Sequence, residues 1–225
     1  AQNSLLRATT YAEKTNDYQL CHLIYAELGC IYILRFYKEY AIEAFNKSYQ
    51  YALQSQNCKY IIASLIYLGR TYGQLERFNQ SIEYYQKAIE IAKEKHITRS
   101  VAIASNELAG IYIEIKDYKK ALYYSKQAIN SSNIGVSKGQ TNLVIGNIYR
   151  EIGPIDSAYY YLNQVVGHKA SVNTVNAAYH ALYELSKREK KYQEAIFYND
   201  KFLNGFDSIF DSHKEQELAE MQEKY

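Results

Sequence analysis

The chain has 225 residues, and its 26 Lys and Arg against 24 Asp and Glu leave a formal net charge of +2. Hydrophobic residues make up 48% and charged residues 22%, which excludes global disorder and gives no basis for nucleic acid or an anionic membrane as the main partner. One Pro and 10 Gly exclude the many tight turns that β-sandwiches and barrels need, and favour long helices.

The first predicted element is a helix over residues 2–15. Ala8 and Ala12 in this helix are matched by Ser48 and Ala52 further along, at the interval of the repeats that follow. Matching small residues at this interval indicate that the helix is the second half of an incomplete repeat. The chain also lacks an initiator Met and stops within a charged helical pattern, so we expect a piece of a longer protein.

A longer pattern then recurs along the chain. It consists of an aliphatic residue, a small residue and a Tyr three positions later. The small residues of the first four copies are Gly29, Gly69, Ala109 and Gly146, at spacings of 40, 40 and 37, and a degenerate fifth copy falls at Leu182-Tyr183. Twelve positions after these small residues come Ala41, Ser81, Ala121, Ala158 and Ala195. Spacings of 3, 4 and 7 within each copy place the residues on one helix face.

Each copy has room for two helices joined by a short turn. The predicted hairpins cover residues 18–55, 57–95, 98–132, 137–166 and 170–206. Small residues at the crossing let the two helices approach, and aromatic residues fill the space beside them. One hairpin cannot cover its own apolar face, so neighbouring hairpins must stack. The sequence predicts an all-α superhelix over residues 1–206, treated as one domain, with its clearest break at 131–135.

These columns resemble the tetratricopeptide repeat. In the first copy the resemblance is carried by Tyr25, Leu28, Gly29, Tyr32, Ala41, Phe45 and Ser48. The family's usual repeat has about 34 residues and a closing Pro. The copies in this chain, at spacings of 37 to 40, are longer and lack that Pro. The difference implies helices longer by about one turn. The resemblance implies a tetratricopeptide solenoid of five hairpins that serves as a binding scaffold.

Residues 207–225 differ from the repeats. Ser212 and Glu215 form a capping-box pattern, and Leu218, Met221 and Tyr225 begin a heptad stripe. Two interpretations stay open: a helix that caps the solenoid, or the start of a coiled coil through which the chain dimerises. Residues 206–210 and the stripe also resemble, more weakly, the junction after tetratricopeptide arrays in membrane-anchored bacterial sensor-regulators.

No sequence motif indicates catalysis, a cofactor or a metal. The chain has no Gly-rich phosphate loop, and its five His include no pair three or four residues apart. The three cysteines Cys21, Cys30 and Cys58 form no CxxC pair and are expected to pack as small apolar residues. We therefore expect a protein that is not an enzyme and needs no cofactor.

The candidate binding site follows from the resemblance, which implies that the first helix of each hairpin lines an inner groove. The expected open positions lie three residues before, one after and four after the small residue of each copy. At its N-terminal end this groove is apolar. Polar candidates further along are Arg70, Asn106, Asn147, Arg150, His180 and Glu184. An amide side chain can pair with a peptide backbone in both directions. The ligand is expected to be an extended peptide or a partner helix, and a merely solvated surface stays open as the alternative.

Two functions from different classes follow. The first is the sensory or interaction region of a larger bacterial transcriptional regulator or signalling protein; the alternative is a freestanding adaptor that assembles a protein complex. Neither involves nucleic acid contacting this part of the chain or insertion into a membrane, since the longest apolar run, residues 60–68, is too short to span one. A sensor would lie on the periplasmic side of a membrane-anchored protein, and an adaptor in the cytoplasm.

Overall fold

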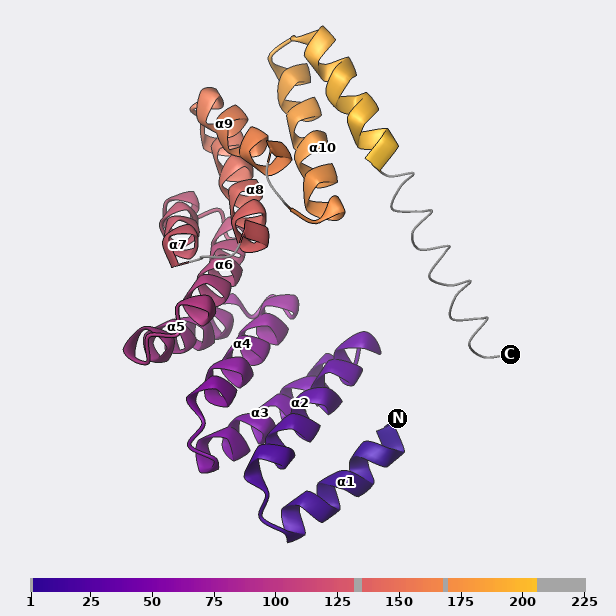
Figure 1. The fold of residues 1–225 in the computed structure, drawn as a ribbon, viewed down its shortest axis with the longest axis vertical. Coiled ribbons are helices and arrows are strands. Elements are labelled where there is room, and N and C mark those ends of the chain that lie inside the picture. The colour runs from indigo at the N-terminus through magenta and orange to yellow at the C-terminus, as the bar shows by residue number, and fades with distance from the viewer. Residues whose placement is uncertain (1, 132–134, 168–169, 206–225) are drawn as a thin grey trace, which may run out of the picture. The chain divides into compact units, whose positions relative to one another are not determined.

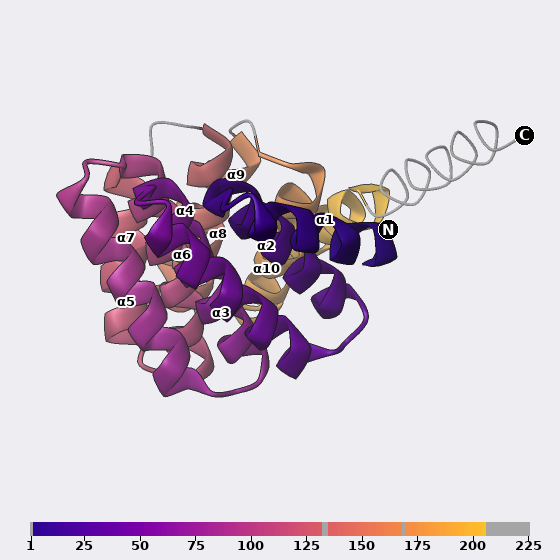
Figure 2. The same cartoon turned by 90° about the horizontal axis from the view of Figure 1, so that it is seen from below.

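The structure, a computed structural model, describes residues 2–131, 135–167 and 170–205. Within those ranges the chain is all-helical. Ten helices are labelled in Figure 1, and residues 192–205 form a further helix after α10. Within residues 2–131, and again within residues 135–205, consecutive helices lie side by side as antiparallel hairpins (Figure 1 and Figure 2). This confirms the predicted helical-hairpin architecture.

Contacts divide the chain into two compact units, residues 1–131 and 132–225, at the break that the sequence predicts. The first unit holds α1 and three hairpins: α1 (Gln2–Lys14), α2 (Tyr18–Leu34), α3 (Lys38–Gln54), α4 (Cys58–Gln74), α5 (Phe78–Glu94), α6 (Thr98–Glu114) and α7 (Tyr118–Ser131). The second unit holds α8 (Gly135–Ile152), α9 (Ile155–Gly167), α10 (Val172–Arg188) and helix 192–205. Whether the two units act as one domain stays a prediction.

Helix α1 is the predicted half repeat, and Glu13 holds it against the first full hairpin. The Glu13 carboxylate accepts hydrogen bonds from the hydroxyls of Tyr25 on α2 and Tyr51 on α3, each at 2.9 Å. The two rings stack with centroids 5.6 Å apart. Burial and the nearby carboxylate raise the pKa of Tyr51 to about 12, so its hydroxyl remains a donor at neutral pH.

The turns explain the length of the repeats. Each helix of α2–α6 has 17 residues, and three residues join it to the next helix. At each turn one non-Gly residue takes a left-handed conformation with a positive φ. In the first unit these are Asn16, Phe36, Gln56, Glu76, His96 and Lys116. They recur every 20 residues, so the hairpins α2–α3 and α4–α5 have the same length. A full repeat of 40 residues is longer than the usual 34.

The left-handed residues end the helices through Schellman hydrogen bonds. At the α2–α3 turn, the Phe36 amide donates to the carbonyl of Ile33 at 3.0 Å, and the Tyr37 amide donates to the carbonyl of Tyr32 at 2.9 Å. Two carbonyls that the helix itself leaves without partners are thereby satisfied. Glu76 and Lys116 are hydrogen-bonded in the same way. The hairpins are therefore closed by backbone geometry, without the Pro that usually closes this repeat.

Glycines in the small-residue column set how closely the two helices of a hairpin approach. A Cβ added at Gly29 would overlap the ring of Phe45, and one at Gly69 would lie 3.0 Å from the ring of Tyr85. Phe45 and Tyr85 are almost fully buried. The second small residue of every copy is buried as well. The packing of small residues against large ones that the columns predicted is confirmed.

The hairpin bounds agree with the predicted ranges to within a few residues. The exception is the C-terminal segment: the predicted capping or coiled-coil helix of 207–225 lies outside the described residues. None of the helices in the described ranges combines the length and apolar character needed to cross a bilayer.

Candidate functional site: two adjoining cavities on the first unit

An apolar cavity of about 230 Å³ opens between α2, α3 and α4. Its lining includes Cys30, Ile33 and Leu34 from α2, Phe45 from α3 and Tyr67 from α4. Phe45 stacks on Tyr67 with ring centroids 5.0 Å apart and planes 7° apart, which gives the cavity a rigid aromatic wall. Leu34 stands at its edge and is 79% exposed. Most of its lining is apolar, and it lies at the N-terminal end of the expected groove.

A second cavity of about 630 Å³ lies between α4, α5 and α6. It shares Arg70 and Gln74 with the apolar cavity, so the two adjoin. Its other charged lining residues are Glu76, Glu107 and Glu114. Arg70 forms an ion pair with Glu107 at 2.6 Å. Tyr85 is almost fully buried and lines the bottom of this cavity. Its hydroxyl donates a hydrogen bond to Glu107 at 3.3 Å.

Glycines shape the second cavity. A Cβ added at Gly73 would lie 2.7 Å from Cδ1 of Ile111, so the end of the Ile111 side chain would have to move. A Cβ added at Gly110 would meet no atom within 4 Å. Gly110 thus keeps space open in front of α6, where the backbone of a ligand can approach.

Three positions in α2 and in α4 line the cavities: one, four and five residues after the small residue. In α2 they are Cys30, Ile33 and Leu34, and in α4 they are Arg70, Gly73 and Gln74. The first two positions were predicted, and the third was missed. Residues one and five after the small residue are four apart and share a helix face, so the spacing alone could have identified this third position.

The position three residues before the small residue was also expected to be open, and there the expectation fails in three copies. Ala26 and Ile66 are each 9% exposed, and Leu143 is 7% exposed. In the first unit α4 contacts both α2 and α6, so this side of the first helix packs against the next repeat. The sequence pattern gives the faces of a helix but does not show which of them meets the neighbouring hairpin.

The structure places the six candidate residues in different surroundings. Arg70 lines both cavities, whereas the half-buried Asn106 lines neither of them. In the second unit, Arg150 Nε lies 3.5 Å from Glu151 Oε1, and Glu184 lies 3.9 Å from Nζ of Lys187. His180 is exposed and packs against Phe202, with ring centroids 4.9 Å apart.

The two candidate asparagines share one feature. The Oδ1 atoms of Asn106 and Asn147 are buried, and neither has a hydrogen-bond partner within the part of the chain that the structure describes. A buried acceptor without a partner costs free energy. The involvement of both residues in binding stays a prediction.

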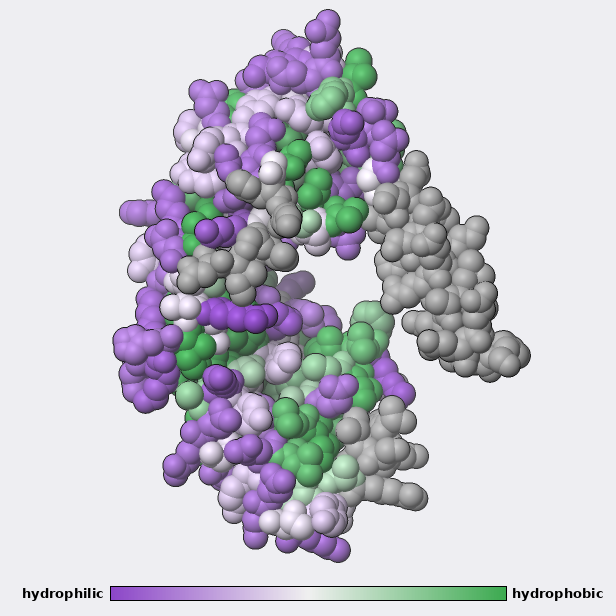
Figure 3. All heavy atoms as spheres, in the orientation of Figure 1, coloured by the Kyte–Doolittle hydropathy of each residue, from purple (hydrophilic) through white to green (hydrophobic). Residues whose placement is uncertain are grey.

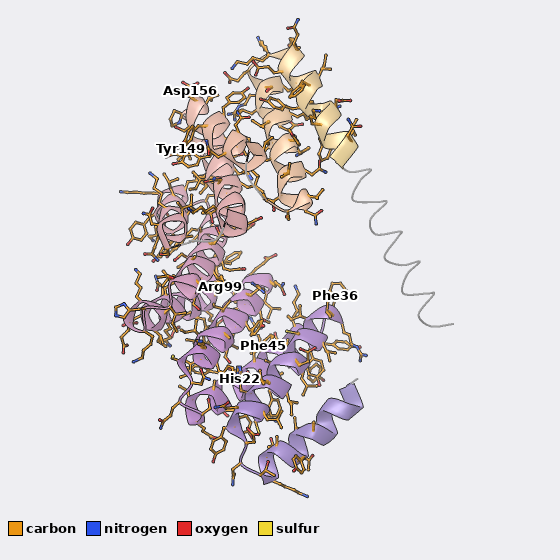
Figure 4. The ribbon with its side chains drawn as sticks, in the orientation of Figure 1. His22, Phe36, Phe45, Arg99, Tyr149 and Asp156 are labelled. Carbon is orange, nitrogen blue, oxygen red and sulfur yellow. The ribbon has the colours of Figure 1, made fainter. Side chains whose placement is uncertain are left out.

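Sequence reasoning missed a buried polar cluster around His22, which Figure 4 labels among α2, α3 and α4. The imidazole Nδ1 lies 2.9 Å from Ser48 Oγ and 3.3 Å from Ser64 Oγ, and the ring stacks on Tyr60 with centroids 4.4 Å apart. His22 is 2% exposed and both serines are fully buried. A signal was present, because Ser48 stands in a column that holds Ala88 and Ala128 in the next two copies.

Acidification should destabilise the first unit through this cluster. Burial lowers the pKa of His22 from its ordinary 6.5, and the Ser48 carbonyl only partly opposes the shift. The unfolded chain therefore takes up the proton first. The stability contribution is complete above about pH 6.5 and is lost as the pH falls from there through the pKa of the folded protein, by up to about 1.4 kcal/mol per pH unit.

Urea unfolding followed by circular dichroism between pH 5.5 and 7.5 measures this dependence. His22→Gln should flatten the slope, whereas His180→Gln, on an exposed residue, should keep it. Equal slopes in the wild type and in His22→Gln would assign the pH dependence to other groups.

Two adjoining cavities on the first helices of stacked hairpins are thus the candidate site of this helical-repeat fold. A family model described as tetratricopeptide repeat matches residues 60–134. The hairpins described on either side of that range have the same architecture. Residues 60–134 are thus tetratricopeptide repeats, and such repeats serve as protein-binding scaffolds.

Known proteins extend this comparison. The chain is 27% identical over 121 residues to response regulator aspartate phosphatase I of Bacillus subtilis (strain 168). The aligned segment covers 54% of this chain and 29% of the relative. It thus spans less than a third of that relative's length. Two solved structures share the fold. BtubC from P. vanneervenii has a TM-score of 0.80 at 15% identity, covering 92% of this chain and 90% of that one. The apo form of RapI has a TM-score of 0.73 at 17% identity, covering 89% and 59%.

Within the described ranges, no group of three or more His, Cys, Asp and Glu side chains is arranged to hold a metal ion. Cys21, Cys30 and Cys58 are free thiols. The site described above is therefore built from apolar cavities, carboxylates, one guanidinium and amide oxygens.

Proposed function

We propose that this chain is the sensory or interaction region of a larger bacterial transcriptional regulator or signalling protein, that it binds a peptide or protein segment, and that it is not an enzyme. The observation that carries the binding role is the pair of adjoining cavities on α2, α4 and α6, lined from equivalent positions in successive repeats. A row of equivalent positions suits an extended ligand that contacts one repeat after another.

The signalling role rests on a different observation. The relative from Bacillus subtilis is named as a phosphatase of response regulators, and the similarity covers about half of this chain. That name supports a place in signalling for this chain as well. A freestanding adaptor is the alternative, and it requires the same binding face.

Sequencing the parent gene on both sides of this chain separates the two functions. A DNA-binding or kinase domain in the same reading frame would support the regulator, and a membrane segment before that domain would place the repeats on the periplasmic side. A reading frame that encodes repeats and nothing else would overturn the regulator and leave the adaptor.

Binding itself is tested with the triple variant Arg70→Ala, Asn106→Ala and Asn147→Ala. The partner is first captured by cross-linking to the parent protein, and its affinity is then measured by calorimetry with the purified proteins. Because one guanidinium and two amide acceptors would be lost, we expect affinity to fall by at least about tenfold with unchanged helical content. The matched control is Lys87→Ala, Asn79→Ala and Asn163→Ala, which changes exposed residues on the second helices α5 and α9. Equal affinity of the two triple variants would overturn the role of Arg70, Asn106 and Asn147 in binding.

A further inference from the structure

The two cavities differ in chemistry although they share a wall. The apolar cavity is lined mainly by carbon, from Ile33, Leu34, Phe45 and the ring of Tyr67. An apolar cavity of about 150 Å³ holds a benzene molecule, so about 230 Å³ is enough for a Leu or Phe side chain. Leu34 at its rim is 79% exposed and Phe36 at the α2–α3 turn is 84% exposed. Figure 3 shows a hydrophobic area on this part of the first unit.

The second cavity carries excess negative charge. Among its lining residues Arg70 is the one base, and its ion pair at 2.6 Å neutralises Glu107. Glu76 and Glu114 form no ion pair within the described residues. The nearby Lys38 lines neither cavity, and its ammonium group donates to the carbonyl of Gln74 at 2.7 Å. Glu76 and Glu114 are both exposed, and as lining residues of one cavity they together attract a cationic group there.

A single ligand that fills both cavities must combine these chemistries at short range. In an extended peptide, side chains two residues apart point to the same side, about 7 Å from each other. The open space in front of Gly110 leaves room for the peptide backbone at the second cavity. An extended peptide can therefore present an apolar and a cationic side chain on the same side.

We infer that the two cavities bind a segment of the partner that carries an apolar side chain and, close to it in sequence, a lysine or arginine. The apolar side chain enters the cavity of Phe45 and Tyr67, and the cationic group lies between Glu76 and Glu114. This inference rests on the proposed binding function and adds to it the chemistry of the ligand.

Three short peptides test the inference, each blocked at both ends. The first has Leu at its second and Lys at its fourth position among glycines; the others replace Lys with Glu or Leu with Ser. Their affinities are measured from chemical-shift changes in the nitrogen-15-labelled chain. We expect the Leu–Lys peptide to bind roughly tenfold more tightly than the Glu peptide and severalfold more tightly than the Ser peptide.

Variants assign these preferences to the two cavities. Glu76→Gln with Glu114→Gln should abolish the preference for Lys over Glu and keep the preference for Leu over Ser. Gly110→Phe should fill the acidic cavity and weaken the Leu–Lys peptide to the level of the Glu peptide, since a Cβ at this position meets no atom within 4 Å. Gly167→Phe, at a second site with open space around the added Cβ, is the matched control and should bind as the wild type does.

Equal affinity for the Lys and Glu peptides would overturn the inference. Chemical-shift changes in other helices that persist in Gly110→Phe would overturn it as well, because the peptide would then bind elsewhere on the chain. No shift change with any of the three peptides would also overturn it. The proposed function is judged separately, by the affinity of the captured partner for the triple alanine variant.

Discussion

Replacing His22 with alanine should lower the free energy of unfolding of the first unit by about 2–4 kcal/mol. The substitution removes a ring that is 2% exposed and stacks on Tyr60. It leaves a cavity, and it takes a hydrogen-bond partner from the buried hydroxyls of Ser48 and Ser64. Both losses fall on the contacts that join α2, α3 and α4. Urea unfolding followed by circular dichroism at pH 7.5 measures the change.

Leu23→Ala is the control for this experiment. Leu23 follows His22 on the same helix but is 49% exposed, so its truncation should cost less than about 1 kcal/mol. If both variants lost the same amount, the cluster would contribute nothing beyond the helix propensity and general packing of α2.

Two glycine-to-alanine substitutions should change stability in opposite directions. Gly29→Ala should destabilise the first unit by about 1–3 kcal/mol, because its Cβ would overlap the buried ring of Phe45. Gly110→Ala should stabilise it by up to about 1 kcal/mol, because the Cβ meets open space and alanine has the higher helix propensity. The same unfolding experiment measures both.

A second substitution shows whether the Phe45 ring is the cause. Phe45→Leu makes room beside residue 29, so Gly29→Ala should cost less in that background than in the wild type. Unchanged cost in the double variant would place the strain elsewhere, as would a destabilising effect of Gly110→Ala.

Most of the fold could be predicted from the sequence because the repeat columns report it several times over. A small residue, a Tyr three positions later and a second small residue after twelve fix both helices of a hairpin and their crossing. The many tyrosines are harder to interpret. Tyr84 lies outside the columns used to predict the hairpins, yet it stacks on Tyr72 with centroids 5.3 Å apart. Tyr72 and Tyr84 lie on different helices, so no spacing within one helix could indicate this pair.

The candidate site could be predicted less completely, and for a related reason. Position within a repeat identified Arg70 and the apolar character of Cys30 and Ile33. The contributions of Glu107 and Phe45 depend on contacts across helices, and so does the burial of Ala26. The polar cluster of His22 likewise joins three helices. A sequence pattern specifies a helix face, whereas a site is made where faces of different helices meet.

The even placing of the left-handed turn residues from Asn16 to Lys116 affects how such a chain can change in length. The segment between two successive left-handed residues contains one complete helix with both of its ends. Gain or loss of two such segments therefore adds or removes a complete hairpin and keeps every later helix in phase. A single residue inserted within a helix would instead rotate the remainder by about 100° and turn its small residues away from the crossing. Duplication of whole hairpins is the route by which this binding face can lengthen while the existing cavities stay intact.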